Sequence, residues 1–325
     1  MQSLEEGQTR DQFAFCCCKG RRELNRLEYS LKSGRLGRIV VTSLLAVVLV
    51  YTLVFNGLAG PGLPPFTQST GNISDLLFTC VTPAGYTFSI WGVIYFALVA
   101  ILIYAISLLF RKVGDDDAWK LGGSVSIPFM IVFIINLNLN VGWLFAWDAV
   151  NATGSAILLL LIAITNAIAI SLSSVSFGKV ASDLYQNSKL DFWAGVCVLN
   201  GYDIYDTWTT LAALINLTAF FTYETDVNGN SVCIGVLVFV LVAYSGYFIL
   251  ENTFLAFWGN PCFTHYIVLL WAMIGIHTEQ KDKASTEVIA LIITLIAASA
   301  VMLVARLIIL VLRNRKNTFY KRSIM

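Results

Sequence analysis

Charged side chains and histidine are both scarce in this sequence of 325 residues. Asp, Glu, Lys and Arg make up only 13% of it and two histidines are present, whereas 57% of the residues are hydrophobic. A soluble domain of this length could not bury so much apolar surface, so we expect the lipid bilayer to be its solvent. Two histidines also give no support for a haem held by a pair of histidine ligands.

Motifs for catalysis and metal binding are missing as well. The sequence contains no glycine-rich phosphate loop, no HExxH motif and no paired-cysteine spacing typical of zinc sites. No nucleophile and base are placed in a plausible arrangement either. We therefore predict a protein that is not an enzyme, with no catalytic residue, no metal, no cofactor and no nucleic-acid partner.

Long hydrophobic runs are what the sequence has in abundance. A helix needs about 20 residues to cross the hydrocarbon core of a bilayer. Backbone groups in lipid must be hydrogen-bonded within the segment, and the runs do not alternate as barrel strands do, so we expect helices. The predicted fold class is all-α, a polytopic membrane helix bundle with about eight transmembrane helices. The expected spans are 38–60, 86–110, 124–147, 155–177, 197–222, 232–257, 263–278 and 288–312.

The basic residues predict the orientation of these spans. Most of the 21 Lys and Arg residues lie in the leading tail, in the connections 111–122 and 178–191, and at the C-terminal end. The opposite connections hold only Lys281 and Lys283. By the positive-inside rule, both termini are expected to be cytosolic. The first run is too long for the core of a signal peptide, so we expect a signal anchor.

The cysteines suggest two different roles. Cys16, Cys17 and Cys18 lie beside a basic patch, which suits S-acylation combined with attraction to anionic lipid, although an unmodified cluster in a tail is the alternative. Cys80 and Cys233 fall at the outer ends of two spans. An oxidising compartment would let them form a disulfide if their Cα atoms come within about 7 Å.

One glycosylation sequon lies well clear of the spans. Asn72 begins an Asn-Ile-Ser triplet in the outer connection 61–85, which otherwise starts with a Pro- and Gly-rich, non-helical stretch. Glycosylation at Asn72, together with a disulfide, favours the plasma membrane or another membrane of the secretory pathway.

The third span carries a polar and aromatic stripe. Asn136, Asn140, Trp143 and Trp147 are spaced so that all four lie on one narrow helical face. An amide in hydrocarbon is costly without a partner, so this face is expected to point into the bundle. The stripe either joins helices to one another or lines a ligand site, and both interpretations remain open.

The fifth span carries a second stripe and, on another side, two carboxylates. The apolar stretch from about 192 is too long for one straight span, so we expect a break at Asn200-Gly201. That break would leave Asp203 and Asp206 near the cytosolic end, where hydration is the expected state. The stripe itself consists of Tyr205, Trp208, Thr209, Ala212 and Asn216.

The order and spacing of these motifs resemble one known family. Pro83 is followed by the stretch WGVIY at 91–95, then Asn140 is followed by Trp143, and Tyr205 is followed by Trp208 and Asn216. This ordered set is similar to the translocator-protein family, whose bacterial members are called tryptophan-rich sensory proteins (TspO). The resemblance covers roughly 78–222 and is strongest to a larger, eight-span branch of the family.

The resemblance implies a five-helix core with a pocket for flat hydrophobic ligands such as tetrapyrroles or sterols. Aromatic rings would stack on a planar ligand and a few amides would orient it. A tetrapyrrole is expected as a ligand and not as a cofactor. The protein is expected to bind the ligand, and translocation of the ligand is left open. The lining implied by the family is Trp91, Tyr95, Asn140, Trp143, Tyr205, Trp208 and Asn216. The expected divisions are a basic tail 1–37, the core 38–222, three additional helices 223–312 and a basic tail 313–325.

The three additional helices hold their own ionisable residues. Glu251, His265 and Arg306 are predicted within or at the ends of spans, where charges need partners or must reach the interface. A Glu251–Arg306 ion pair is one interpretation. A proton relay through His265 is the other, in a proton-coupled transporter of a small solute that is driven by Glu251, His265 and the pair Asp203 and Asp206. A structural or signalling protein without a ligand is a third hypothesis. The expected partners are lipid and a hydrophobic ligand, with a homodimer left open.

Overall fold

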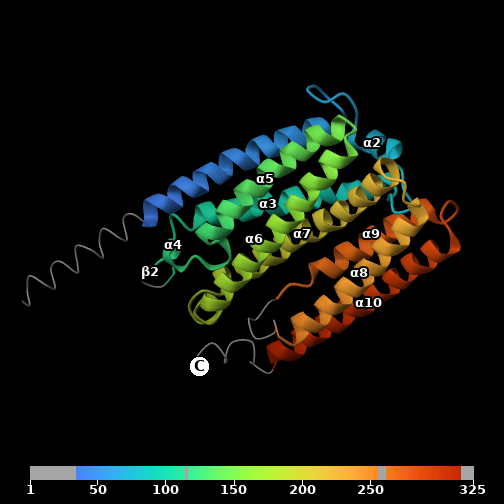
Figure 1. Ribbon diagram of the computed structural model, residues 1–325. Helices are drawn as coiled ribbons and strands as arrows, with labels where there is room; N and C mark the ends of the chain where they lie inside the picture. The colour runs from blue at the N-terminus through green and yellow to red at the C-terminus, as the bar shows by residue number, and fades with distance from the viewer. Residues whose placement is uncertain (1–33, 114–115, 255–260, 316–325) are drawn as a thin grey trace, which may run out of the picture.

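The computed structural model describes residues 34–113, 116–254 and 261–315, and eight long helices lie side by side along one axis (Figure 1). The prediction of an all-α polytopic membrane bundle is confirmed. The long helices are Gly34–Ala59, α3 Ile90–Ser107, α5 Ile127–Asp148, α6 Ala152–Asn187, α7 Lys189–Glu224, α8 Gly229–Asn252, α9 Thr264–Gln280 and α10 Thr286–Arg315.

Six of these helices are long and apolar enough to cross a membrane by length and composition. The two others are α9, which has 17 residues, and α7, whose buried face is rich in polar side chains. Large apolar side chains point outward around the bundle: Val47 is 63% exposed, Phe96 79% and Val301 68%. Such a surface contacts lipid, because in water it would be an aggregation site.

Short elements connect the long helices. The outer connection was expected to be non-helical, and this is wrong in part, because Ser69 caps the short helix α2 by accepting from the backbone N–H of Asn72 at 3.1 Å. The others are the 3₁₀ turn η1, a two-stranded antiparallel sheet, α4 and the turn η2. Their bounds are α2 Thr70–Leu76, η1 Gly85–Ser89, β1 Lys112–Val113, β2 Asp116–Asp117, α4 Ala118–Leu121 and η2 Gly123–Val125.

The expectation of a loop over 178–191 is wrong, because α6 and α7 extend through this connection and only Ser188 separates them. The apolar runs end earlier than the helices do, since polar residues also form helix beyond the bilayer. Ser188 caps α7, because its hydroxyl accepts from the backbone N–H of Asp191 at 3.4 Å and donates to the carboxylate of Asp191 at 2.7 Å. Arg111 binds the same carboxylate at 2.6 Å and so ties this turn to the end of α3.

The predicted break at Asn200-Gly201 is also wrong, because α7 is continuous from Lys189 to Glu224. Asn200 instead accepts from the backbone N–H of Phe263 at 3.1 Å. A Cβ atom at Gly201 would lie 3.2 Å from Cβ of Ala97, so the glycine allows α7 to approach α3 closely. Asp203 therefore lies in the middle of α7 and is buried, not hydrated at a helix end.

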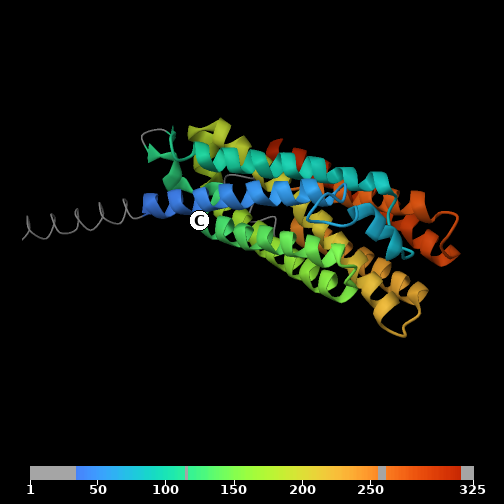
Figure 2. The same ribbon diagram turned by 90° about the horizontal axis from the view of Figure 1, so that it is seen from above.

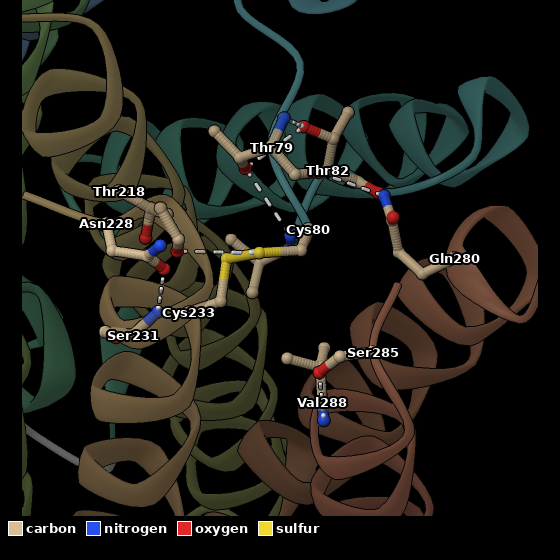
Figure 3. The surroundings of a disulfide bond; sticks show 12 residues. Thr79, Cys80, Thr82, Thr218, Asn228, Ser231, Cys233, Gln280, Ser285 and Val288 are labelled. Atoms are coloured by element: carbon tan, nitrogen blue, oxygen red, sulfur yellow. Dashed lines mark hydrogen bonds between the residues drawn. A yellow bond between two sulfur atoms is a disulfide. The ribbon is translucent and has the colours of Figure 1, made fainter. Parts of the chain in front are cut away.

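The start of the first helix and the end of α10 lie at the same end of the bundle (Figures 1 and 2). At the opposite end a disulfide joins Cys80, after α2, to Cys233 of α8, with Cα atoms 6.2 Å apart (Figure 3). Gln280 at the end of α9 donates to the carbonyl oxygen of Thr82 at 2.8 Å. The long segment between α2 and α3 is thus attached to the additional helices. The acylation candidates Cys16, Cys17 and Cys18 lie outside the described residues.

Candidate functional site

A cavity of about 350 Å³ lies between the first helix, α3 and α5, at the end of the bundle that carries α2. Three of the seven predicted ligand-binding residues line it: Trp91, Tyr95 and Trp143. The lining also includes Asn56, Phe88, Leu144 and the small residues Gly60, Ser69, Thr70, Gly71 and Gly85.

The α3 wall consists of stacked rings. Trp91 and Tyr95 are one helical turn apart, and their rings stack with centroids 5.4 Å apart at 20°. Behind them, Trp208 of α7 meets the Trp91 ring edge to face at 6.5 Å. Tyr205 lies 6.3 Å from the same ring, and its hydroxyl donates to Asn136 of α5 at 2.7 Å. Trp208 and Tyr205 therefore support the wall and do not line the cavity.

The α5 wall has the same two-layer construction. Trp143 lines the cavity, stacks on Trp147 at 5.8 Å and donates from Nε1 to Asn216 of α7 at 3.5 Å. Asn140 accepts from Nδ2 of Asn56 at 2.8 Å, and Asn56 is the amide that lines the cavity. The α5 stripe points into the bundle as predicted. Asn140 and Asn216 do not line the cavity, and each accepts a hydrogen bond from a residue that does.

The outer cover of the cavity is the stretch Ser69–Gly71. The carboxylate of Asp148, the last residue of α5, accepts from the backbone N–H groups of Thr67 at 2.9 Å and Gln68 at 3.1 Å. Trp147 donates from Nε1 to the carbonyl oxygen of Thr70 at 3.2 Å. The end of α5 therefore fixes the cover by three hydrogen bonds.

The Pro-Ala-Gly stretch before α3 and the turn η1 that follows it contact α9. The backbone N–H of Ala84 donates to the carbonyl oxygen of Gly275 at 3.1 Å, and Trp271 donates from Nε1 to that of Thr87 at 3.0 Å. A Cβ atom at Gly275 would lie 2.2 Å from Oγ1 of Thr87, so only glycine permits this contact. α3 begins at Ile90, later than the predicted start at 86, because the residues that contact α9 form the 3₁₀ turn η1.

Two buried donors, in residues that lie behind the cavity lining, have no hydrogen-bond partner among the described residues. They are Nδ2 of Asn140 and Nε1 of Trp208. Most buried polar groups in proteins are paired, so unpaired donors near a cavity are typical of a site that a ligand or water completes.

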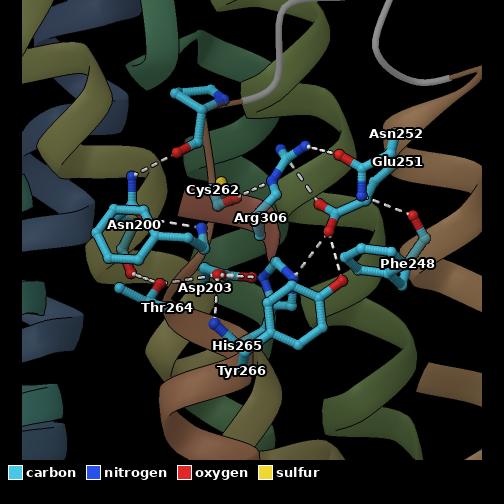
Figure 4. A network of polar contacts seen from close by, with 12 residues as sticks. Asn200, Asp203, Phe248, Glu251, Asn252, Cys262, Thr264, His265, Tyr266 and Arg306 are labelled. Carbon is cyan, nitrogen blue, oxygen red and sulfur yellow. Dashed lines mark hydrogen bonds and ion pairs between the residues drawn. The ribbon is translucent and has the colours of Figure 1, made fainter. Parts of the chain in front are cut away.

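The ionisable candidates form a separate, buried network (Figure 4). Arg306 pairs with Glu251 at 3.2 Å, and both side chains are fully buried. Nε2 of His265 lies 3.5 Å from Glu251, and its Nδ1 lies 2.8 Å from Asp203. Tyr266 also donates its hydroxyl to Glu251. The structure thus brings the three predicted residues together with Asp203. The expected helix break had placed Asp203 in water, whereas the transporter hypothesis had grouped it with Glu251 and His265.

Several lining residues were not predicted from the sequence. Asn56 is a single amide in an apolar run, which was a usable signal, since such an amide needs a partner inside the bundle. The small residues of the cover gave no signal, because their position depends on contacts with Asp148 and Trp147 that are distant in sequence. Asn72 lies exposed on α2.

The fold and the cavity define a polytopic membrane protein whose helices enclose an aromatic-walled site. The pattern of the family described as TSPO-like protein matches residues 41–311, and the chain belongs to that family. The match takes in α8, α9 and α10, beyond the stretch 78–222 that carries the motifs. No curated protein and no solved structure matches the chain.

Proposed function

We propose that this membrane protein binds a flat hydrophobic ligand, of the tetrapyrrole or sterol class, in the aromatic cavity. The observation that supports this most is the lining: ring systems of Trp91, Tyr95 and Trp143 surround the space, and its polar groups are amides, hydroxyls and backbone. Offset stacking on such rings favours a planar apolar molecule, and a few polar groups fix its orientation.

The size of the cavity limits how such a ligand is held. A volume of about 350 Å³ is near the low end of ligand pockets, which span roughly 300–1,000 Å³. A whole tetrapyrrole therefore requires the cover Ser69–Gly71 to move outward, whereas a smaller planar molecule fits beneath it. Translocation of the ligand would need the same movement.

The test is titration of the purified protein in lipid nanodiscs with protoporphyrin IX and with the fluorescent sterol dehydroergosterol. We expect saturable binding of at least one probe, weakened at least tenfold in Trp91→Leu and in Trp143→Leu. Trp193 lies on α7, 52% exposed and outside the cavity lining, so Trp193→Leu is the matched control. Equal affinities in all three variants, or no binding of either probe, would refute the proposed site.

We also propose that all eight long helices span the membrane, with both termini cytosolic, in the plasma membrane or the secretory pathway. Asn72 and the Cys80–Cys233 disulfide would then face the lumen or the exterior. A glycosidase-sensitive mobility shift that disappears in Asn72→Gln supports this topology. Accessibility of Asn72 only from the cytosol contradicts it.

A second candidate function is proton-coupled transport of a small solute. The contact of His265 with both Asp203 and Glu251 favours it, because an imidazole between two carboxylates can pass a proton from one to the other. Proteoliposomes would show solute uptake that requires a pH gradient and that is lost in His265→Gln. Uptake that is insensitive to the gradient would exclude this candidate.

A further inference from the structure

A second, larger cavity of about 470 Å³ lies between α6, α7 and α8. Its walls carry Asp203 and Asp206 of α7, the phenol rings of Tyr244 and Tyr247 of α8, and His265 at the start of α9. It shares no lining residue with the aromatic cavity.

The two carboxylates of this cavity differ in their hydrogen bonds. The carboxylate of Asp203 already has hydrogen-bond partners. Its Oδ2 accepts from Oγ1 of Thr264 at 2.7 Å and from the backbone N–H of His265 at 2.9 Å, and it lies 2.8 Å from Nδ1 of His265. Asp206 lies three residues on and so on the same helical side. Its Oδ1 is buried and has no hydrogen-bond partner among the described residues. A buried carboxylate oxygen without a partner is costly, so a ligand or a proton would satisfy this atom.

The charge around the cavity is unbalanced. The cavity lining holds two carboxylates, those of Asp203 and Asp206, and one imidazole, that of His265, whereas the Glu251–Arg306 pair lies outside the lining. Arg306 and Glu251 neutralise each other, and a protonated His265 neutralises Asp203. Even then, one negative charge remains at Asp206 beside open space, and one monovalent cation would balance it.

The remaining lining distinguishes between kinds of cation. The described residues hold no group of three or more His, Cys, Asp and Glu side chains that could bind a metal ion. The cavity offers instead two phenol rings and the hydroxyls of Ser171, Thr207 and Thr210. Aromatic faces attract organic ammonium groups, and hydroxyl oxygens accept from their N–H donors.

We propose that the cavity between α6, α7 and α8 is a second ligand site, and that it binds a small organic ammonium ion with the carboxylate of Asp206 as its counter-ion. The site is independent of the aromatic cavity, so it stands whether or not a tetrapyrrole or sterol binds there. Its ligand belongs to a different chemical class, since this cavity selects for charge and the other for a flat apolar shape.

Calorimetric titration of the full-length protein in uncharged-lipid nanodiscs tests the site. The probes are benzyltrimethylammonium and benzylamine at neutral pH, with benzyl alcohol as the uncharged partner of similar shape. We expect at least one ammonium to bind at least tenfold more tightly than the alcohol. Asp206→Asn should weaken that binding at least tenfold, and Asp183→Asn, which removes the same charge from an exposed position on α6, should not weaken it.

Two further measurements keep the result decisive. Tyr247→Leu removes one ring without changing charge and should weaken ammonium binding about threefold, as loss of one cation–π contact does. The circular dichroism spectrum of Asp206→Asn in the same nanodiscs should match that of the unaltered chain, which shows that the variant is folded. Binding of the alcohol as tight as that of both ammonium ions, no binding of either ammonium ion, or equal affinities in Asp206→Asn and Asp183→Asn would overturn the proposal.

Discussion

The two cavities of this protein lie on two sides of one helix and differ in almost every chemical respect. Toward α3 and α5, α7 presents Tyr205, Trp208 and Asn216, which support rings around a space without charged side chains. Toward α6 and α8 it presents Asp203 and Asp206, next to a buried ion pair. The helix therefore separates an apolar site from a charged one within a single bundle.

This difference shows why α7 is not a purely apolar helix. Two of its buried polar residues bind neighbouring helices, since Tyr205 donates to Asn136 of α5 and Asp203 contacts His265 of α9. A uniformly apolar helix would satisfy the bilayer but could not join the five-helix part to the additional helices. The polar contacts of α7 join the five-helix part to the additional helices, since polar side chains form hydrogen bonds across helices and apolar side chains only pack.

The largest expected effect comes from breaking the ion pair that supports the charged side. Arg306→Met leaves Glu251 fully buried without its guanidinium and should lower the free energy of unfolding by about 3–5 kcal/mol. Thermal unfolding in nanodiscs measures this, with Arg35→Met at an exposed position as the control. Replacing both partners, as in Glu251→Gln with Arg306→Met, should recover much of the loss. No recovery would mean that the pair is not the cause.

The next effect concerns the end of the bundle that carries α2, where the disulfide attaches the segment between α2 and α3 to α8. Cys80→Ser removes a link between residues 153 positions apart and should cost about 2–4 kcal/mol of stability. Cys197→Ser changes an exposed free cysteine and should cost nothing measurable. If both variants unfold at the same temperature as the unaltered chain, the disulfide does not stabilise this end.

A smaller effect tests whether α9 shapes the aromatic cavity. Gly275→Ala places a Cβ atom 2.2 Å from Oγ1 of Thr87 and should cost about 1–3 kcal/mol through overpacking. It should also weaken protoporphyrin IX binding, because it displaces η1. Gly246 of α8 has no atom within 4 Å of an added Cβ, so Gly246→Ala is the control. Unchanged affinity in Gly275→Ala would show that the additional helices do not influence the cavity.

The smallest effect separates lining residues from supporting ones. Tyr205→Phe removes a hydroxyl that donates to Asn136 at 2.7 Å and should cost about 1 kcal/mol. Because the hydroxyl points away from the cavity, protoporphyrin IX affinity should stay within twofold of the unaltered chain. Tyr223→Phe removes a hydroxyl that donates to the carbonyl oxygen of Phe78 at 2.7 Å. Because Tyr223 is 48% exposed and water can replace that bond, the change should cost less than Tyr205→Phe and leave the affinity unchanged. A large loss of affinity in Tyr205→Phe would place that hydroxyl in the site.

The sequence predicted what depends on periodicity and missed what depends on distant contacts. Hydrophobic runs located the long helices, and residue spacing placed Asn140 and Trp143 on a buried face. The same reasoning put Asp203 in water, because a polar residue near the end of an apolar run is normally hydrated. Its partner His265 lies on another helix, and only the packing of α9 on α7 brings the two residues together.

Which of the seven family residues line the cavity could not be predicted either. The resemblance to the family implies that Trp91, Trp208 and Tyr205 face the same interior, but it does not show which ring lies in front. That order is set by how closely α3 and α7 approach at Gly201 and Ala97. The cover Ser69–Gly71 is likewise fixed by Asp148 and Trp147, from a helix that lies far away in sequence.

The most direct test of two independent sites is a crossed titration. Trp91→Leu and Asp206→Asn are each titrated with protoporphyrin IX and with benzyltrimethylammonium, in the same nanodiscs. We predict that Trp91→Leu loses at least tenfold in affinity for the porphyrin alone, and that Asp206→Asn loses at least tenfold for the ammonium ion alone. Loss of both ligands in either variant, or of neither ligand in both, would contradict the division of the bundle by α7.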